Sequence, residues 1–395
     1  MWDHLSAWLQ HALAVLRVNQ QSNARTLVYD FATAPNVRIV YTDAYRPFAF
    51  DRPNSPQNIS SYCPHILGPG LHHDNRDWRF CTGEKPGIMK MHVVEQRNAM
   101  FDRGRNHMGA TFDSGNVYLM SHPNSMPVVH LDNVLHYDQL AQALEPYAAE
   151  AQSHFWFGTV QHVLTLYDTL PSHVPIVVAW SQSISSKFHE VLNLNMSRFV
   201  PFDPSATYSA ARLYSVMYQP WSRDLQGGEP VSPQSMKRLM NHMRPVPVQD
   251  DARRTVVLVS RKDRASRNCV NHAELLVALR GHTWKKDIRV VEFTGTSMST
   301  QQAQSLFANA EMVVAPHGGA LLNIVFMRPG TSVVEIGYHE TNATNYRSMR
   351  FPPWYFVMAK LLNMSYSLVM APGAYNAHIN CPIDEVLDAV KKQMY

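Results

Sequence analysis

Two short stretches of the chain combine residue types that suit the binding of an anion, and the first is residues 316–319 (PHGG). It lies between the apolar run of residues 312–315 and a second apolar run that opens at Ala320. This order predicts a buried strand, a tight turn and the start of a helix. Two glycines let a ligand approach the backbone closely, and the free N–H groups at the start of a helix favour a phosphate. Because such corners are also common packing devices, the pattern alone fits either a ligand site or a structural turn.

The second stretch is basic: Arg261, Lys262, Arg264 and Arg267 directly follow the apolar run of residues 255–260. Parallel strands end at one edge of a sheet, so this stretch and the glycine corner are expected outside the same edge. There Arg261 and Arg267 would enclose a diphosphate from the side opposite the glycines. The alternative is a solvated basic loop, which is the usual fate of a run of charges.

Several other classes of site lack their signature in this sequence. The glycine corner matches neither GxGxxG nor a P-loop, and the chain has no GxSxG and no HExxH. His272 and Glu274 have the spacing of a zinc deaminase, but the PCxxC half of that motif is missing. The candidate ligands in residues 72–77 (HHDNRD) are consecutive, which points them in different directions, so we expect no metal there.

The elements that would position both stretches alternate along the second half of the chain. Strands are predicted at residues 255–260, 288–293, 312–315 and 332–336, and helices at 234–243, 273–280 and 302–310. This order is typical of a doubly wound parallel sheet. In the first half, the patterns predict helices over residues 140–170 and 187–194 and strands at 175–180 and 210–218.

The length and composition indicate two folded domains. A chain of 395 residues is long for one compact core, and the linker at residues 224–233 (DLQGGEPVSP) divides it. We expect an N-terminal α/β domain in residues 1–230 and a C-terminal Rossmann-like domain in residues 234–375. A final amphipathic helix, residues 376–395, is expected to pack back on the first domain. The net charge of +4 gives no support to a nucleic-acid partner.

The cysteines and sequons bear on the compartment. Four cysteines are too few for a disulfide scaffold and lack the spacing of a zinc site, and a Cys63–Cys81 bridge and free buried thiols both fit. The sequons suit a lumenal or secreted protein, although some arise by chance; they begin at Asn58, Asn195, Asn342 and Asn363. No apolar run reaches the roughly 18 residues of a membrane span, so any anchor is expected upstream of residue 1.

The order of the motifs in residues 250–370 resembles glycosyltransferase family 61. The motifs are Arg261, Arg267, Asn271 and Glu274, then residues 316–323 (PHGGALLN), 326–330 (FMRPG) and 333–336 (VVEI). The family includes plant xylosyl- and arabinosyltransferases and animal O-mannose and EGF-domain N-acetylglucosaminyltransferases. Upstream, residues 153–156 (SHFW) are similar to the family's Asn/His element, with Ser153 in place of the usual asparagine and Gly158 where an acid is common.

The resemblance implies an α/β fold of the GT-B type, in which two Rossmann-like domains face a cleft and a C-terminal helix crosses back. It implies an inverting transferase that moves xylose, arabinose or N-acetylglucosamine from a UDP-sugar to a hydroxyl of a glycan or glycoprotein. The donor would bind the C-terminal domain and the acceptor the N-terminal domain, with no metal and no other cofactor. The resemblance also implies the lumen of the Golgi or ER.

The site residues follow from the motifs together with the resemblance. We expect the N–H groups at Gly318 and Gly319 to bind the diphosphate. Arg261 and Arg267 would neutralise the charge that grows as UDP leaves, which is the work of a divalent ion in other transferases.

The remaining site residues have less direct roles. Glu335 is expected to accept hydrogen bonds from the ribose hydroxyls, and His317 and Asn323 to position the phosphate or the uracil. His154 is the candidate catalytic base because imidazole titrates near neutrality, although a helix-capping or core role also fits it.

Two other classes of function stay open. The first is a catalytically inactive GT-B-like module that binds a nucleotide or a glycan, since Gly158 stands where an acid is common. The second is a basic nucleic-acid binder that uses residues 253–267, but that stretch lacks interleaved aromatic residues. Release of UDP from a UDP-sugar would separate both from a transferase.

Overall fold

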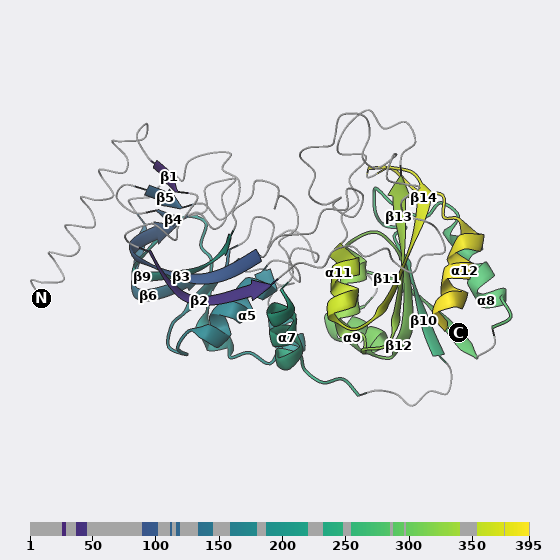
Figure 1. Ribbon diagram of the computed structural model, residues 1–395, viewed down its shortest axis with the longest axis horizontal. Helices are drawn as coiled ribbons and strands as arrows, with labels where there is room; N and C mark the ends of the chain where they lie inside the picture. The colour runs from purple at the N-terminus through teal and green to yellow at the C-terminus, as the bar shows by residue number, and fades with distance from the viewer. Residues whose placement is uncertain are drawn as a thin grey trace, which may run out of the picture. The chain divides into compact units, whose positions relative to one another are not determined.

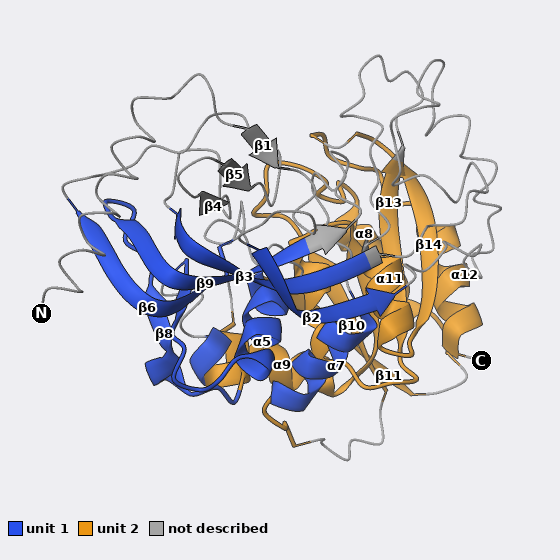
Figure 2. Ribbon diagram, turned by 60° about the vertical axis from the view of Figure 1, so that its left-hand side comes forward, with its two compact units in different colours: residues 1–46, 88–189, 193–242 blue, residues 47–87, 190–192, 243–395 orange. Residues whose placement is uncertain are grey.

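A computed structural model of the chain gives its fold (Figure 1). The structure describes residues 26–28, 37–45, 89–101, 111–112, 116–118, 133–144, 159–179, 187–219, 232–247, 254–284, 287–295, 298–339, 354–374 and 376–394. The chain divides into two compact units (Figure 2). Residues 1–46, 88–189 and 193–242 form the first unit, and residues 47–87, 190–192 and 243–395 form the second.

The first unit is built on a mixed β-sheet with the strand order β1-β5-β4-β3-β9-β6-β7-β8, in which β2 also pairs with β3. The long strand β3 (Met89–Phe101) runs antiparallel to β2 (Val37–Tyr45) and to β9 (Thr207–Gln219). Beyond β9 the pairing becomes parallel, starting with β6 (Val134–Gln142). The shorter strands are β1 (Thr26–Val28), β4 (Thr111–Phe112), β5 (Asn116–Tyr118), β7 (Ile176–Val178) and β8 (Phe199–Pro201). The first unit therefore combines helices with a mixed sheet, which is compatible with the α/β domain expected in this half.

Helix α5 (Val160–Thr169) contacts helix α7 (Pro233–His242) within the first unit. Nε2 of His242 lies 2.7 Å from Oδ1 of Asp168, which joins the two helices. We expected α7 to open the second domain because the linker at residues 224–233 precedes it. That expectation is wrong, since the contacts of α7 with α5 place this helix in the first unit.

Within the helix predicted over residues 140–170, α5 is confirmed, the first residues belong to a strand, and residues 145–158 lie outside the described residues. Leu140 lies in β6, and Leu144 lies two residues beyond the end of that strand. Two residues four apart share one face of a helix, but they also share one face of a strand. Their spacing therefore did not distinguish a helix from a strand. Farther along, residues expected in a longer helix form the short π-helix η5 (Lys187–Val191), which the 3-10 helix η6 (Met196–Arg198) follows.

The second unit contains the predicted parallel sheet, with five strands in the order β11-β10-β12-β13-β14. The strands are β10 (Arg254–Ser260), β11 (Ile288–Thr294), β12 (Ala310–Pro316), β13 (Ser332–His339) and β14 (Ser365–Pro372). All four pairs are parallel, and β14 was not predicted from the sequence. Runs such as Val256–Val259 read as continuous apolar stretches because helices cover both faces of such a sheet.

Helices cover the two faces of this sheet as separate layers (Figure 1). One layer contains α8 (His272–Gly281) and α12 (Ile383–Met394), which contact each other. The other contains α9 (Thr300–Ala308) and α11 (Trp354–Leu361), both in contact with the 3-10 helix η8 (Gly319–Phe326). The second unit is therefore a three-layer α/β/α sandwich.

The C-terminal helix α12 corrects another expectation. We expected it to pack back on the first domain, but it contacts α8, β13 and β14 of the second unit. Its apolar stripe, which includes Val386 and Val390, is buried there. None of the described helices is long and apolar enough to span a membrane.

Candidate functional site

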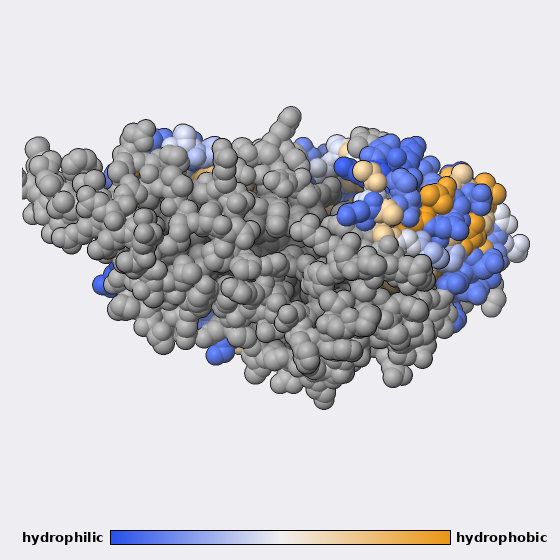
Figure 3. All heavy atoms as spheres, turned by 90° about the horizontal axis from the view of Figure 1, so that it is seen from above, coloured by the Kyte–Doolittle hydropathy of each residue, from blue (hydrophilic) through white to orange (hydrophobic). Residues whose placement is uncertain are grey.

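The candidate site lies where the order of the parallel sheet reverses. The chain runs from β10 outward to β11 and then returns past β10 to β12. The register pairs Leu258 with Val314, so β10 and β12 end at the same level. Ligands of doubly wound sheets bind outside the carboxyl ends of strands at such a switch point. Seen from above, hydrophilic residues dominate the described surface of the second unit (Figure 3).

Arg261 lies directly against the glycine corner. A Cβ atom added to Gly318 would overlap Nη1 of Arg261 and would lie 2.7 Å from its Cζ. A larger residue at this position would displace the guanidinium end of Arg261, and the φ of 155° also favours glycine. Nη2 of Arg261 donates to the carbonyl of Ser266 at 3.3 Å, which holds the side chain across its own loop. The basic loop and the glycine corner thus meet at one edge, as the order of the strands predicts.

Backbone pairing ties the basic loop to the segment that precedes α12. The N–H of Arg267 donates to the carbonyl of Ala377 at 2.6 Å, and Arg267 has a positive φ of 55°. The N–H of Ile379 donates to the carbonyl of Asn268 at 2.9 Å, and the N–H of Val270 donates to the carbonyl of Ile379 at 2.9 Å. The loop that carries both arginines is therefore fixed along its second half.

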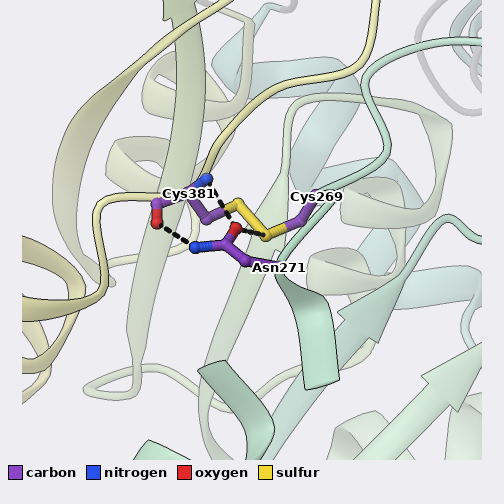
Figure 4. The surroundings of a disulfide bond; sticks show 3 residues. All are labelled: Cys269, Asn271 and Cys381. Carbon is purple, nitrogen blue, oxygen red and sulfur yellow. Dashed lines mark hydrogen bonds between the residues drawn. A yellow bond between two sulfur atoms is a disulfide. The ribbon is translucent and has the colours of Figure 1, made fainter. Parts of the chain in front are cut away.

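A disulfide between Cys269 and Cys381 closes this connection (Figure 4). Beside it, Nδ2 of Asn271 donates to the carbonyl of Cys381 at 2.8 Å, and Oδ1 accepts from the N–H of Cys381 at 2.9 Å. The sequence left free buried thiols open as one alternative, and this alternative does not hold for Cys269 and Cys381, which pair across 112 residues of sequence. Cys63 and Cys81 lie outside the described residues.

The glycine corner leads into the 3-10 helix η8 rather than into an α-helix. The carbonyl of Gly318 accepts from the N–H of Leu321 at 2.9 Å and from the hydroxyl of Tyr355 at 2.7 Å. Asn323 is buried, and its Nδ2 donates to the carbonyl of Ala320 at 2.9 Å. Asn323 therefore fixes the first turn of η8, and its contact with the phosphate or uracil stays a prediction.

A buried polar network lies behind the corner. Nδ1 of His317 is 2.5 Å from Oε1 of Glu335, and the hydroxyl of Tyr366 donates to Oε2 of Glu335 at 2.6 Å. Glu335 is 0% exposed and His317 is 3% exposed. Because Glu335 is fully buried, its contact with the ribose hydroxyls stays a prediction. In this structure the carboxylate instead orients the imidazole.

The surroundings of His317 favour a neutral imidazole. Burial is the main cause that lowers the pKa of His317, and the nearby Arg267 and Arg261 add to the decrease. The hydrogen bond with Glu335 acts in the opposite direction but does not reverse the shift. The lowering by the two arginines agrees with the position of Arg261 against Gly318.

The family comparison decides the class of protein. The model of the family Glycosyltransferase 61 matches residues 126–334, which is more than half of the 395-residue chain. The chain belongs to glycosyltransferase family 61. Its activity is therefore that of a glycosyltransferase, with a donor and an acceptor as the two substrates. No curated protein matches the chain.

The family 61 match includes most of the residues that form the site. It covers Arg261, Arg267, the glycine corner and Asn323, and it ends one residue before Glu335. Residue 154, the candidate base, lies within the matched range but outside the described residues. Among the described residues, no group of three or more His, Cys, Asp or Glu side chains could hold a metal ion.

Sequence reasoning missed two tyrosines of this family 61 site. Tyr355 comes from α11 and Tyr366 from β14, and both are buried with hydroxyl groups bonded to the corner or to Glu335. Burial is the main cause that raises the pKa of each phenol, so both remain hydrogen-bond donors at neutral pH. The sequence did contain a signal for these residues, since both tyrosines stand inside apolar segments. A buried tyrosine hydroxyl requires a polar partner, which indicates a buried polar group nearby.

Proposed function

We propose that this glycosyltransferase binds a UDP-sugar at the switch point of its parallel sheet and transfers the sugar, with inversion, to a hydroxyl of a glycan or glycoprotein. The observation that carries the proposal is the contact between the guanidinium of Arg261 and the backbone of Gly318. A fixed cation and a glycine corner at one sheet edge suit the two negatively charged groups of a diphosphate.

The reaction would break the bond between the anomeric carbon and the β-phosphate oxygen as the acceptor oxygen attacks from the opposite face. The acceptor proton would pass to a base, for which His154 is the candidate, and UDP would leave with the bonding electrons. Arg261 and Arg267 would stabilise the charge on the leaving diphosphate. Two guanidinium groups at this edge would do the work of a divalent ion in a metal-independent transfer, and that of Arg261 is already held by the carbonyl of Ser266.

The other site residues would act around the diphosphate. The N–H groups at Gly318 and Gly319 would donate to its oxygens, and His317 and Asn323 would position the phosphate or the uracil. Glu335 would act mainly by orienting the His317 ring, as its buried hydrogen bonds suggest. The GT-B arrangement, with the acceptor bound by the first unit, is part of the same proposal.

The test is donor binding followed by turnover. UDP-xylose, UDP-arabinose and UDP-N-acetylglucosamine are compared by thermal shift, where a ligand at one hundred times its dissociation constant adds about 2.7 kcal/mol of stability. Arg261→Ala should abolish the shift, whereas Arg264→Ala should retain it, because Arg264 is an exposed cation of the same loop. Release of UDP in the presence of EDTA and a glycan acceptor should persist. Binding without turnover by any donor would favour an inactive module, and absence of UDP binding would refute the proposal.

The proposed compartment is the lumen of the secretory pathway, Golgi or ER. The Cys269–Cys381 disulfide supports it because such bonds persist in oxidising compartments. The sequons at Asn195 and Asn363 also support it, since both asparagines are exposed. The protein expressed in a secretory host should lose mass on endoglycosidase treatment, and less so after Asn195→Gln. An unmodified protein that retains free thiols at Cys269 and Cys381 would refute the compartment.

A further inference from the structure

We propose that Tyr355 is a positioning residue for the diphosphate: its hydroxyl fixes the peptide between Gly318 and Gly319 so that the N–H of Gly319 faces the phosphate. This inference rests on the proposed function and extends it to a side chain that does not touch the donor. Tyr355 lies on α11, which contacts η8 and β14 of the second unit.

A peptide flanked by two glycines needs such a support. Neither Gly318 nor Gly319 has a Cβ atom, so rotation about the bonds on both sides of this peptide meets little steric resistance. A rotated peptide would present its carbonyl oxygen where the N–H had been. Because a carbonyl oxygen repels a phosphate oxygen, the affinity for a diphosphate depends on which orientation the peptide keeps.

Two hydrogen bonds fix the observed orientation. The carbonyl of Gly318 accepts from the hydroxyl of Tyr355 at 2.7 Å and from the N–H of Leu321 at 2.9 Å. The carbonyl and the N–H of one trans peptide point to opposite sides. Since Tyr355 is 1% exposed, the carbonyl is held toward the protein interior, and the N–H of Gly319 is directed away from it.

The tyrosine is itself held in place by the buried network. Its ring lies edge-on to the ring of His317, with centroids 5.3 Å apart. His317 is hydrogen-bonded to Glu335, which also accepts from Tyr366. These contacts of His317, Glu335 and Tyr366 hold the hydroxyl of Tyr355 in place without a donor. The glycine corner is therefore preorganised before the donor binds.

The first test compares Tyr355→Phe with the wild-type protein by isothermal titration. Removal of one hydrogen bond to the Gly318 carbonyl should weaken UDP binding about three- to tenfold. Binding of uridine, which lacks the phosphates, should stay unchanged. The matched control is Tyr208→Phe in the first unit, where another buried tyrosine hydroxyl accepts from the N–H of Asp203 at 2.7 Å. It should lose stability without changing the affinity for UDP.

Each outcome separates this inference from the proposed function. If the wild-type protein does not bind UDP, the proposed function fails. If it binds UDP and Tyr355→Phe binds UDP equally well, or loses uridine binding to the same extent, the role of Tyr355 is refuted. If Tyr355→Phe does not fold, the inference is tested by NMR on the wild-type protein labelled with ¹⁵N-glycine. The amide signal of Gly319 should shift with UDP and not with uridine, and an unchanged signal at saturating UDP would refute the inference.

Discussion

Replacement of both Cys269 and Cys381 by serine should destabilise the second unit substantially. The bond closes a loop of 112 residues, and the loop-entropy relation for a loop of that length gives about 4.8 kcal/mol at 25 °C. Removed native disulfides commonly cost about 2–5 kcal/mol, so we expect a loss of about 3–5 kcal/mol. The effect arises largely in the unfolded chain. The disulfide lowers the conformational entropy of the unfolded state, so removing it makes unfolding more favourable.

Denaturant unfolding followed by circular dichroism measures this loss as a lower midpoint. Asn271 provides an internal comparison: Asn271→Ala removes two hydrogen bonds to the backbone of Cys381 but keeps the disulfide, so it should cost less than the double serine variant. Reductant should destabilise the wild-type second unit and should have no comparable effect on the double variant. If the double variant unfolds within about 0.5 kcal/mol of the wild type, the disulfide does not constrain the chain as argued.

Three further perturbations test the site and the first unit. Gly318→Ala should weaken UDP binding more than tenfold in titration calorimetry, because its Cβ would take the space of the Arg261 guanidinium, whereas Gly281→Ala, where a Cβ meets open space, should leave binding unchanged. Arg261→Lys should weaken UDP binding by about tenfold, or about 1.4 kcal/mol, since an ammonium lacks the planar fork, and equal affinity would refute the guanidinium role. The pKa of His242 is raised by its hydrogen bond with Asp168, so this contact should stabilise the first unit fully below pH 6.5 and lose its effect as the pH rises through the higher folded-state value. Denaturation of His242→Gln at pH 6 and pH 8 should show a smaller decline with pH than the wild type, and identical declines would contradict the linkage.

The parallel sheet and the position of the glycine corner at its edge could be predicted because buried strands and glycine turns leave a clear local pattern in the sequence. A strand covered on both faces is an apolar run, and residues 312–315 have that form before Pro316 interrupts it. The shared strand edge then follows from the parallel order, without knowledge of any side-chain contact. The contact between Arg261 and Gly318 is the geometric result of that reasoning.

The remaining features depend on contacts between residues far apart in sequence, which local patterns do not contain. The spacing of four cysteines allows several pairings, so nothing local selected Cys269 with Cys381. The first unit pairs strands such as β3 and β9 across more than a hundred residues, and its mixed order has no local signature. The C-terminal helix shows an apolar stripe that the sequence reveals, but the surface that covers the stripe is set by the tertiary fold.

The charges at the glycine corner explain how a buried carboxylate can lie beneath a site for a phosphate. Glu335 is 0% exposed, and its two oxygens accept from His317 and Tyr366, so His317, which adjoins Gly318, connects the carboxylate to the corner. Burial and the nearby arginines lower the pKa of His317, so the imidazole separates the charges without adding one of its own. The positive charge then comes from Arg261 and Arg267, which are partly exposed where a diphosphate would arrive. The carboxylate of Glu335 orients the His317 ring, and the guanidinium groups of Arg261 and Arg267 attract the diphosphate. The buried negative charge therefore does not prevent the site from binding an anion.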